Sequence, residues 1–147
     1  MGPATFDTDD NVAVLLRRVM ASLGDHIGHG LKDNDLTATQ AHPLFLLDQG
    51  LATTMADLAR ELHMDPGATT RLVDRLDAKG LCRRVRTAVD RRTVTVELTD
   101  AGRLLARRVP AVACAALNHH LAGFSREEWR HLMALLQRMR HNGDAVR

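Results

Sequence analysis

The sequence is poor in aromatic residues: it has no Tyr, one Trp and three Phe among 147 residues. Hydrophobic residues still make up 45% of the chain. The chain can therefore bury a core, and that core is expected to be aliphatic. A length of 147 residues indicates one domain of ordinary size.

Long apolar runs and catalytic motifs are also missing. No stretch approaches the roughly 20 apolar residues that a membrane-spanning helix needs, and the acidic segment 1–10 lacks the apolar centre of a secretory signal. We therefore expect a cytoplasmic protein. The chain shows no nucleophile motif, phosphate-binding loop or paired-carboxylate site, so we expect neither an enzyme nor a resident cofactor.

The positive charge is concentrated in one segment. Residues 71–92 contain eight Lys or Arg and three Asp, a net charge of +5, whereas the whole chain carries +2. Residues 1–70 are acidic, with a net charge of −6. A basic stripe on a nearly neutral protein suits a polyanion that docks at one face. The alternative is a solvated charged surface.

Apolar residues at three- and four-residue spacing predict helices in the first part of the chain. One helix covers about residues 11–31. A second follows a capping box at Thr37–Gln40 and ends near Gly50. Pro43 lies beyond the first turn of this second helix, so it should bend the helix or make its start irregular.

The central segment predicts a helix-turn-helix followed by a hairpin. A short helix should begin at Thr54–Asp57, and the next should begin at the Asp65-Pro66 pair and stop at Gly80. The spacing then changes to period two in Leu81–Arg86 and Thr93–Leu98, which predicts two strands. A hairpin directly after a helix-turn-helix is the winged-helix arrangement.

Two further helices should follow the hairpin. The first runs from Thr99 to about Leu121 with a kink at Pro110, and the second follows a capping box at Ser125–Glu128. The outer helices are too apolar for a small monomer to bury around so short a central module, which indicates a homodimer. The expected fold class is mainly α with a small β-hairpin wing: a winged helix-turn-helix with N- and C-terminal dimerisation helices.

The residues around the hairpin resemble a known family. Asp90-x-Arg92 followed by Val94-x-Val96-x-Leu98-Thr99-x-x-Gly102 is similar to the wing signature of the MarR family of bacterial transcription regulators. The run ATTRLVDRLDAKGL at 68–81 resembles its recognition helix, and LTATQ at 36–40 resembles its second helix start. The resemblance covers about residues 10–140. It implies a single 1–147 domain with a winged-helix DNA-binding lobe at about 36–100 and dimerisation helices at about 10–32 and 100–141.

The recognition helix supplies the first expected DNA contacts. In the family, its first two turns enter the major groove. Those turns here hold Pro66, Gly67, Ala68, Thr70 and Arg71. Arg71 can form two hydrogen bonds with guanine, although an intrahelical pair with Asp74 is the alternative. Arg75, one turn later, should hold a phosphate or a salt bridge.

The tip of the wing supplies the second set. Arg91 and Arg92 can reach a narrow minor groove, where the negative potential attracts Arg. The resemblance favours Arg92 for insertion, with Asp90 holding the geometry of the tip. Two symmetric wings and helices predict a double-stranded, pseudo-palindromic operator with half-sites about one turn apart.

Phosphate contacts are expected from two other places. Arg83, Arg84 and Arg86 alternate along the leading strand, so at least one should face the phosphates. Arg84 and Arg86 are the candidates for these phosphate contacts. Thr53 and Thr54 stand at a helix N-terminus, which can seat a phosphate.

Family members often have a small-molecule pocket between the dimerisation helices and the DNA-binding lobe. The candidates for its lining here are Arg17, Met20, His26, His42, Phe45 and Leu46. Arg17 could pair with a carboxylate, so an aromatic or phenolic acid is the expected effector, although each apolar residue could equally be core. Such a ligand would change DNA affinity through a coupling free energy of typically about 1–3 kcal/mol.

Histidines and cysteines raise two sensing alternatives. The zinc-sensing branch of the family has a His at the position of His42, but its ligands on the fifth helix fall on Val109 and Ala113, which cannot coordinate zinc. We therefore expect no metal. The peroxide-sensing branch has its reactive Cys in the first helix, which has none here, so Cys82 and Cys114 are expected to be buried, inert thiols.

Together these patterns predict a homodimeric, nucleoid-associated DNA-binding regulator. Most regulators in this family are repressors, and this one would be released by a small ligand. A zinc-responsive regulator that uses the histidines is the alternative. A His-based metalloenzyme or a protein-only binding module would be a different class, and the second leaves Arg91 and Arg92 unexplained. The sequence identifies neither the effector nor the operator.

Overall fold

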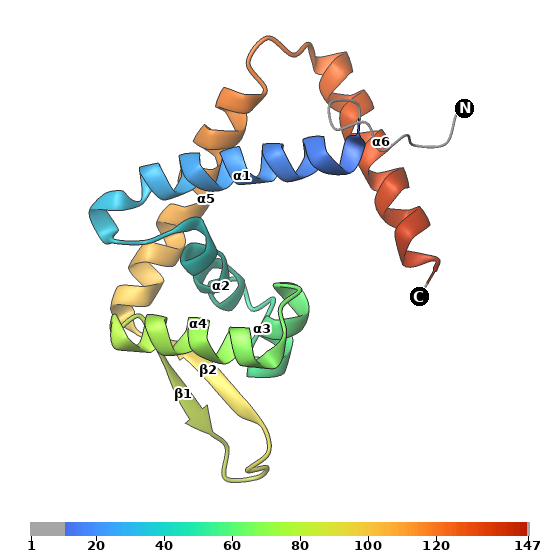
Figure 1. Ribbon diagram of the computed structural model, residues 1–147. Coiled ribbons are helices and arrows are strands. Elements are labelled where there is room, and N and C mark those ends of the chain that lie inside the picture. The colour runs from blue at the N-terminus through green and yellow to red at the C-terminus, as the bar shows by residue number, and fades with distance from the viewer. Residues whose placement is uncertain (1–10, 147) are drawn as a thin grey trace. The chain divides into compact units, whose positions relative to one another are not determined.

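The computed structural model describes residues 11–146, which divide into two compact units with the boundary in the chain between Ala116 and Leu117. Their elements, in chain order, are α1 (Val12–Gly30), the 3-10 turn η1 (Lys32–Asn34), α2 (Ala38–Asp48), α3 (Met55–Glu61), α4 (Pro66–Ala78), β1 (Cys82–Arg86), β2 (Val94–Leu98), α5 (Asp100–His120) and α6 (Arg126–Asp144) (Figure 1). The acidic segment 1–10, on which the expected cytoplasmic location partly rests, lies outside the described residues. The proposed dimerisation role of the outer helices stays a prediction.

Side-chain caps begin the helices where the sequence patterns predict. The boxes at Thr37–Gln40, Thr54–Asp57 and Ser125–Glu128 are all formed, with both reciprocal hydrogen bonds present. Asp65 accepts from the N–H of Ala68 at 2.8 Å and caps α4. These predicted starts are confirmed. Because α2 begins with a complete capping box, Pro43 does not make the start of the helix irregular; the alternative, a bend of the helix at Pro43, stays a prediction.

A tight connector joins α3 and α4 into a helix-turn-helix. His63 in this connector has a φ of 51°, a left-handed conformation that non-glycine residues seldom adopt. After α4, Gly80 takes a φ of 70°, and the N–H of Leu81 bonds the Leu76 carbonyl at 3.0 Å. Gly80 therefore stops the helix in the way its sequence position predicts.

The wing is a two-stranded antiparallel hairpin that is tied to the start of α3. Cys82 pairs with Leu98 and Arg84 with Val96, so Cys82, Arg84 and Arg86 share one face of the ribbon. A bridge joins Thr54 to Thr95, and the N–H of Val96 donates to the Thr53 carbonyl at 2.9 Å. The expected fold class, mainly helical with a small hairpin wing, is confirmed.

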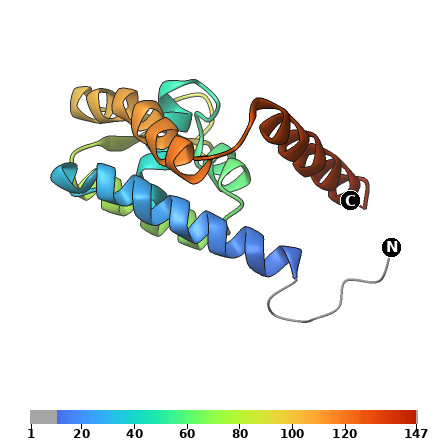
Figure 2. The same ribbon diagram turned by 90° about the horizontal axis from the view of Figure 1, so that it is seen from above.

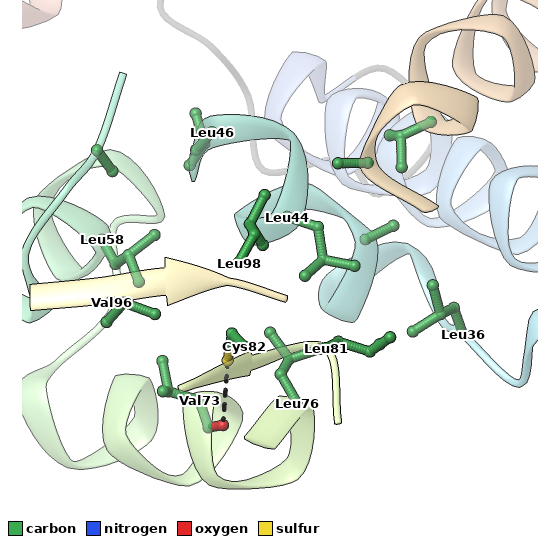
Figure 3. Packing of buried hydrophobic residues seen from close by; sticks show 14 of the residues in the cluster. Leu36, Leu44, Leu46, Leu58, Val73, Leu76, Leu81, Cys82, Val96 and Leu98 are labelled. Atoms are coloured by element: carbon green, nitrogen blue, oxygen red, sulfur yellow. Dashed lines mark hydrogen bonds between the residues drawn. The ribbon is translucent and has the colours of Figure 1, made fainter. Parts of the chain in front are cut away.

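Aliphatic side chains from α2, the helix-turn-helix, the hairpin and α5 form the core of the first unit (Figure 3). Leu44, Leu58 and Leu76 are fully buried, and Leu98 of β2 packs in the same cluster. The Cys82 thiol lies among them and faces the Val73 carbonyl at 3.8 Å. The predicted aliphatic character of the core is therefore confirmed.

Two of the described helices contain no fully buried residue, although Ile27 of α1 packs against the core. Within the described residues, neither α1 nor α6 contains a buried residue, although both are amphipathic. Met20 on α1 is 66% exposed and Met139 on α6 is 45% exposed. The first turns of α1 extend beyond α2, α3 and α4 (Figures 1 and 2). No helix in the 11–146 range has the length and apolar character that crossing a membrane requires.

The junction between α4, β1 and α5 is closed by Thr99 and Gly102. The Thr99 hydroxyl donates to the Gly80 carbonyl at 2.6 Å and accepts from the Gly102 N–H at 3.1 Å. A Cβ on Gly102 would collide with the carbonyl oxygen of Leu81. Only a residue without a side chain allows the first turn of α5 to lie this close to the chain entering β1.

We predict that Gly102→Ala will lower the free energy of unfolding by at least about 2 kcal/mol, because the added methyl meets backbone that cannot rotate away. Urea unfolding measures this difference. The matched control is Gly143→Ala on α6, where an added Cβ meets no atom within 4 Å and the helix propensity of Ala favours stability by up to about 1 kcal/mol. Equal stabilities of the two variants would contradict the assigned close approach.

Candidate nucleic-acid interface

The outward face of α4 is a continuous exposed strip. Gly67, Thr70, Arg71 and Asp74 recur at helical spacing and are all exposed, whereas the opposite face is buried in the core. The helix therefore turns one full side toward solvent. The predicted reading residues Pro66, Gly67, Thr70, Arg71 and Arg75 are exposed, and Ala68 is half-buried.

Local contacts at the start of α4 orient its polar side chains. The Thr70 hydroxyl donates to the Pro66 carbonyl at 2.9 Å, so its hydrogen is used inside the helix and its oxygen remains an acceptor. A Cβ built on Gly67 would lie 3.5 Å from Nη1 of Arg71. That is an ordinary contact distance, so the Arg71 guanidinium lies beside Gly67, and no ion pair within residues 11–146 joins Arg71 to Asp74.

Asp90 organises the tip of the wing. Its carboxylate accepts from the Arg92 N–H at 2.9 Å and from the Thr93 hydroxyl at 3.1 Å, while its carbonyl accepts from the Thr87 hydroxyl at 3.1 Å. These three bonds fix the turn, in the role expected of Asp90. Arg91 and Arg92 are exposed at this tip.

The arginines of β1 have different surroundings. Arg84 forms an ion pair with Asp74 of α4. Arg83 points to the other face of the ribbon, where its guanidinium lies 3.5 Å from Glu97, its partner across the hairpin. Arg86 is exposed, and no ion pair involving it is found within residues 11–146.

A groove of about 420 Å³ lies between α3, α4 and the wing. Five of the predicted DNA-binding residues line it: Thr54, Pro66, Thr70, Arg84 and Arg92. They come from segments separated by up to 38 positions in the chain, and two of them are cationic. The groove is therefore a concave surface that can receive an extended anionic chain.

The start of α3 differs from the expected phosphate seat. The Asp57 carboxylate accepts from the N–H groups of Thr53 and Thr54 at 3.0 and 3.1 Å, and from the Thr53 hydroxyl at 3.0 Å. These donated hydrogen bonds hold the pKa of Asp57 well below its usual range. The donors that a phosphate would need already bind a negative charge, which weakens the prediction made for Thr53 and Thr54.

A second cavity, of about 630 Å³, lies among α1, α2, α5 and the turn after α3. Met20, His42 and Phe45 line it, as expected of a ligand pocket. Leu46 does not, because it is buried in the core, and Arg17 and His26 are outside the lining. Thr39, Met64 and Cys114 also line the cavity, and no sequence pattern marks them, because they reach it only through the packing of distant segments.

The histidines and cysteines are not gathered into a metal site. No group of three or more His, Cys, Asp or Glu within residues 11–146 could hold a metal ion. Cys82 is buried, as expected, but Cys114 is exposed and lines the 630 Å³ cavity. The expectation of a buried Cys114 is therefore wrong: small alanines surround it in sequence, but its own turn of α5 faces the cavity.

The chain has relatives in sequence. The model described as the MarR family matches residues 36–94. The uncharacterised HTH-type transcriptional regulator YdgJ of Bacillus subtilis (strain 168) is 34% identical over 99 residues. That match covers 67% of this chain and 60% of YdgJ, so the chain aligns with less than two thirds of this relative.

Solved structures share the fold. The S. aureus MepR–DNA complex superposes with a TM-score of 0.81 at 24% identity, over 90% of this chain and 98% of that one. The reduced form of E. coli MarR gives 0.77 at 26% identity, over 87% and 95%. Bordetella bronchiseptica BpsR, whose DNA binding is regulated by 6-hydroxynicotinic acid, gives 0.76 at 25% identity, over 94% and 97%.

The two thiols should differ in reactivity. Burial, followed by the nearby charge of Asp77, raises the pKa of Cys82 to about 11, and thiolate is the reactive form. In a Cys114→Ser variant, Cys82 should react with a disulfide reagent at pH 8 only when the protein unfolds. A Cys82→Ala variant, which retains Cys114, is the control and should react while folded. Fast reaction of native Cys82 would contradict its assigned burial.

Proposed function

This chain belongs to the MarR family, and we propose that it is a DNA-binding transcription regulator that acts as a homodimer. The observation that carries the proposal is the groove beside the exposed strip of α4, where Thr70 of α4 and Arg92 of the wing tip come together. A protein with this function would work in the cytoplasm, associated with the nucleoid. Genome-wide mapping of its binding sites would test the proposal, and the absence of any enriched site would refute it.

The part of the DNA that each arginine is proposed to contact follows from where that arginine lies. Arg71, on the exposed strip of α4, would contact base edges in the major groove, because a guanidinium matches the two acceptors of guanine. Arg91 and Arg92, on a tip held by Asp90, would enter the minor groove. Pro66, Gly67 and Ala68 bring no polar side chain, so the wing and the shape of the DNA would carry much of the specificity.

The homodimer is supported by the amphipathic outer helices. Apolar residues on α1 and on α6 stay exposed in the protomer: Val12, Leu15, Val19 and Met20 on α1, and Trp129, Met133, Leu135, Leu136 and Met139 on α6. Soluble monomers rarely expose apolar faces of this size. A two-fold dimer would cover them and would match an operator with half-sites about one turn, roughly 10 bp, apart.

We further propose that a small ligand in the 630 Å³ cavity weakens DNA binding, which would make the protein a ligand-released repressor. The cavity has a volume typical of small-molecule sites and is lined mainly by apolar side chains. Its polar groups are few: Thr39, His42 and Cys114. BpsR, a structural neighbour, responds to an aromatic acid. Because no Lys or Arg among residues 11–146 lines the cavity, neutral aromatic ligands belong in the test beside acids.

We predict that Arg92→Ala will weaken operator binding by more than tenfold, because the wing tip loses one of its two minor-groove cations. Fluorescence anisotropy with a labelled operator measures the affinity. Arg83→Ala is the matched control, since Arg83 is on the same hairpin, faces the other side and is paired with Glu97. Arg71→Ala should instead flatten the preference for operator over scrambled DNA.

Light scattering on the same samples checks that folding and assembly are intact. Each variant should have twice the 16.2 kDa mass of the protomer. An unchanged affinity in Arg92→Ala would remove the wing from the interface. A monomeric wild-type protein would contradict the dimer.

A cavity-filling variant tests the proposed ligand site. Gly24 is in the middle of α1 and lines the cavity, and a Cβ there would have its nearest neighbour at 4.0 Å. Gly24→Leu should therefore fold, because Leu also favours helix more than Gly does, and should fill part of the cavity. We expect ligands found by screening aromatic acids and their neutral amides to reduce DNA affinity in the wild type by about 5- to 150-fold, but hardly at all in this variant. An equal response would exclude this cavity.

A further inference from the structure

Asp74 is an acidic residue on the strip of α4 that faces outward. It lies one turn after Thr70 and Arg71, and its side chain is 56% exposed. A carboxylate in this position would repel DNA phosphates if it were left without a counter-charge. Its counter-charge is Arg84 from β1, with Nη2 of the guanidinium bonded to Oδ1 of the carboxylate.

The pair links two elements that would both touch DNA. Asp74 belongs to the helix and Arg84 to the wing strand, ten positions later in the chain. Arg84 also lines the groove between α3, α4 and the wing. A carboxylate and a phosphate compete for the same guanidinium hydrogens, because both are anionic acceptors that Arg can bind through two parallel N–H···O bonds.

We propose that the Asp74 carboxylate takes the place of a DNA phosphate at Arg84 and so limits sequence-independent binding. This proposal rests on the proposed DNA-binding function. If Asp74 did not bind it, the Arg84 guanidinium would add one phosphate contact. Such a contact contributes affinity without sequence information. A genome offers a very large excess of non-operator sites. Without the Arg84 phosphate contact, a smaller share of the protein is bound at those sites.

The same reasoning assigns the phosphate contact of β1 to Arg86. Arg83 is on the far face of the ribbon and pairs with Glu97, and Arg84 is held by Asp74. Arg86 shares the face of Arg84, is exposed and has no ion pair within residues 11–146. Of the three arginines in β1, Arg86 is therefore the one whose guanidinium is available to the DNA backbone.

The salt dependence of binding to a random-sequence duplex tests both assignments. Each neutralised phosphate contributes about 0.9 to the slope of log K against log salt concentration. Asp74→Asn should release Arg84 to a phosphate. It should therefore make the slope steeper by about 0.9 and raise the affinity at low salt by about tenfold. Arg86→Gln should make the slope shallower by about 0.9.

Asp77→Asn is the matched control, because it removes the same charge from the same helix and no ion pair within residues 11–146 joins Asp77 to the wing. It should leave the slope within about 0.3 of the wild type. Asp74→Asn combined with Arg84→Gln should return the slope to near the wild-type value. A slope in Asp74→Asn equal to that of Asp77→Asn would overturn the proposal, since Arg84 would then already bind phosphate.

A measurement without DNA separates this proposal from the proposed function. In the free protein, the NMR signal of the Arg84 Nε–H group should move in Asp74→Asn and stay in place in Asp77→Asn. An Arg84 signal that does not respond to Asp74→Asn would overturn the pair even if the protein binds DNA. A wild-type protein that shifts this signal as expected but binds no duplex at low salt would refute DNA binding, and with it the role assigned to the pair.

Discussion

The close approach of Gly102 to the Leu81 carbonyl is the constraint on which the geometry of the interface depends. It brings the first turn of α5 against the chain that leaves α4 and enters β1. The Thr99 hydroxyl joins the same two segments through Gly80 and Gly102. The base of the hairpin is thereby fixed to the end of α4. The two walls of the groove, α4 and the hairpin, both connect to this one rigid junction. The groove can therefore keep its shape without a ligand.

Charge pairing then decides which cations the groove offers. The segment 71–92 carries a net +5, but not all of its eight cations are available to a polyanion, because Arg83 is engaged by Glu97 and Arg84 by Asp74. The start of α3 is similarly occupied by Asp57. The available positive charge is concentrated at the wing tip and along the exposed strip of α4. The basic segment therefore offers a polyanion a few arginines at defined positions and not an evenly charged surface.

The 630 Å³ cavity and α4 share a common neighbour, the corner between α1 and α2. Lys79 at the end of α4 bonds Gln40 at 3.2 Å and pairs with Asp35, and Arg108 of α5 bonds Asn34 at 2.8 Å. The following helix, α2, supplies one wall of the cavity. A ligand that moved α2 against α5 would therefore act on the same corner that holds the end of α4.

Local patterns alone determined the elements of this protein: the caps at Thr37, Thr54 and Ser125, the stop at Gly80 and the two period-two strands depend on neighbours within a few residues. The pattern also indicated the fold class and the charged segment. Tertiary structure decided what each side chain meets. Cys114 faces a cavity, Leu46 enters the core and Arg84 finds Asp74, because these outcomes depend on how segments far apart in the chain pack together, which no local spacing encodes.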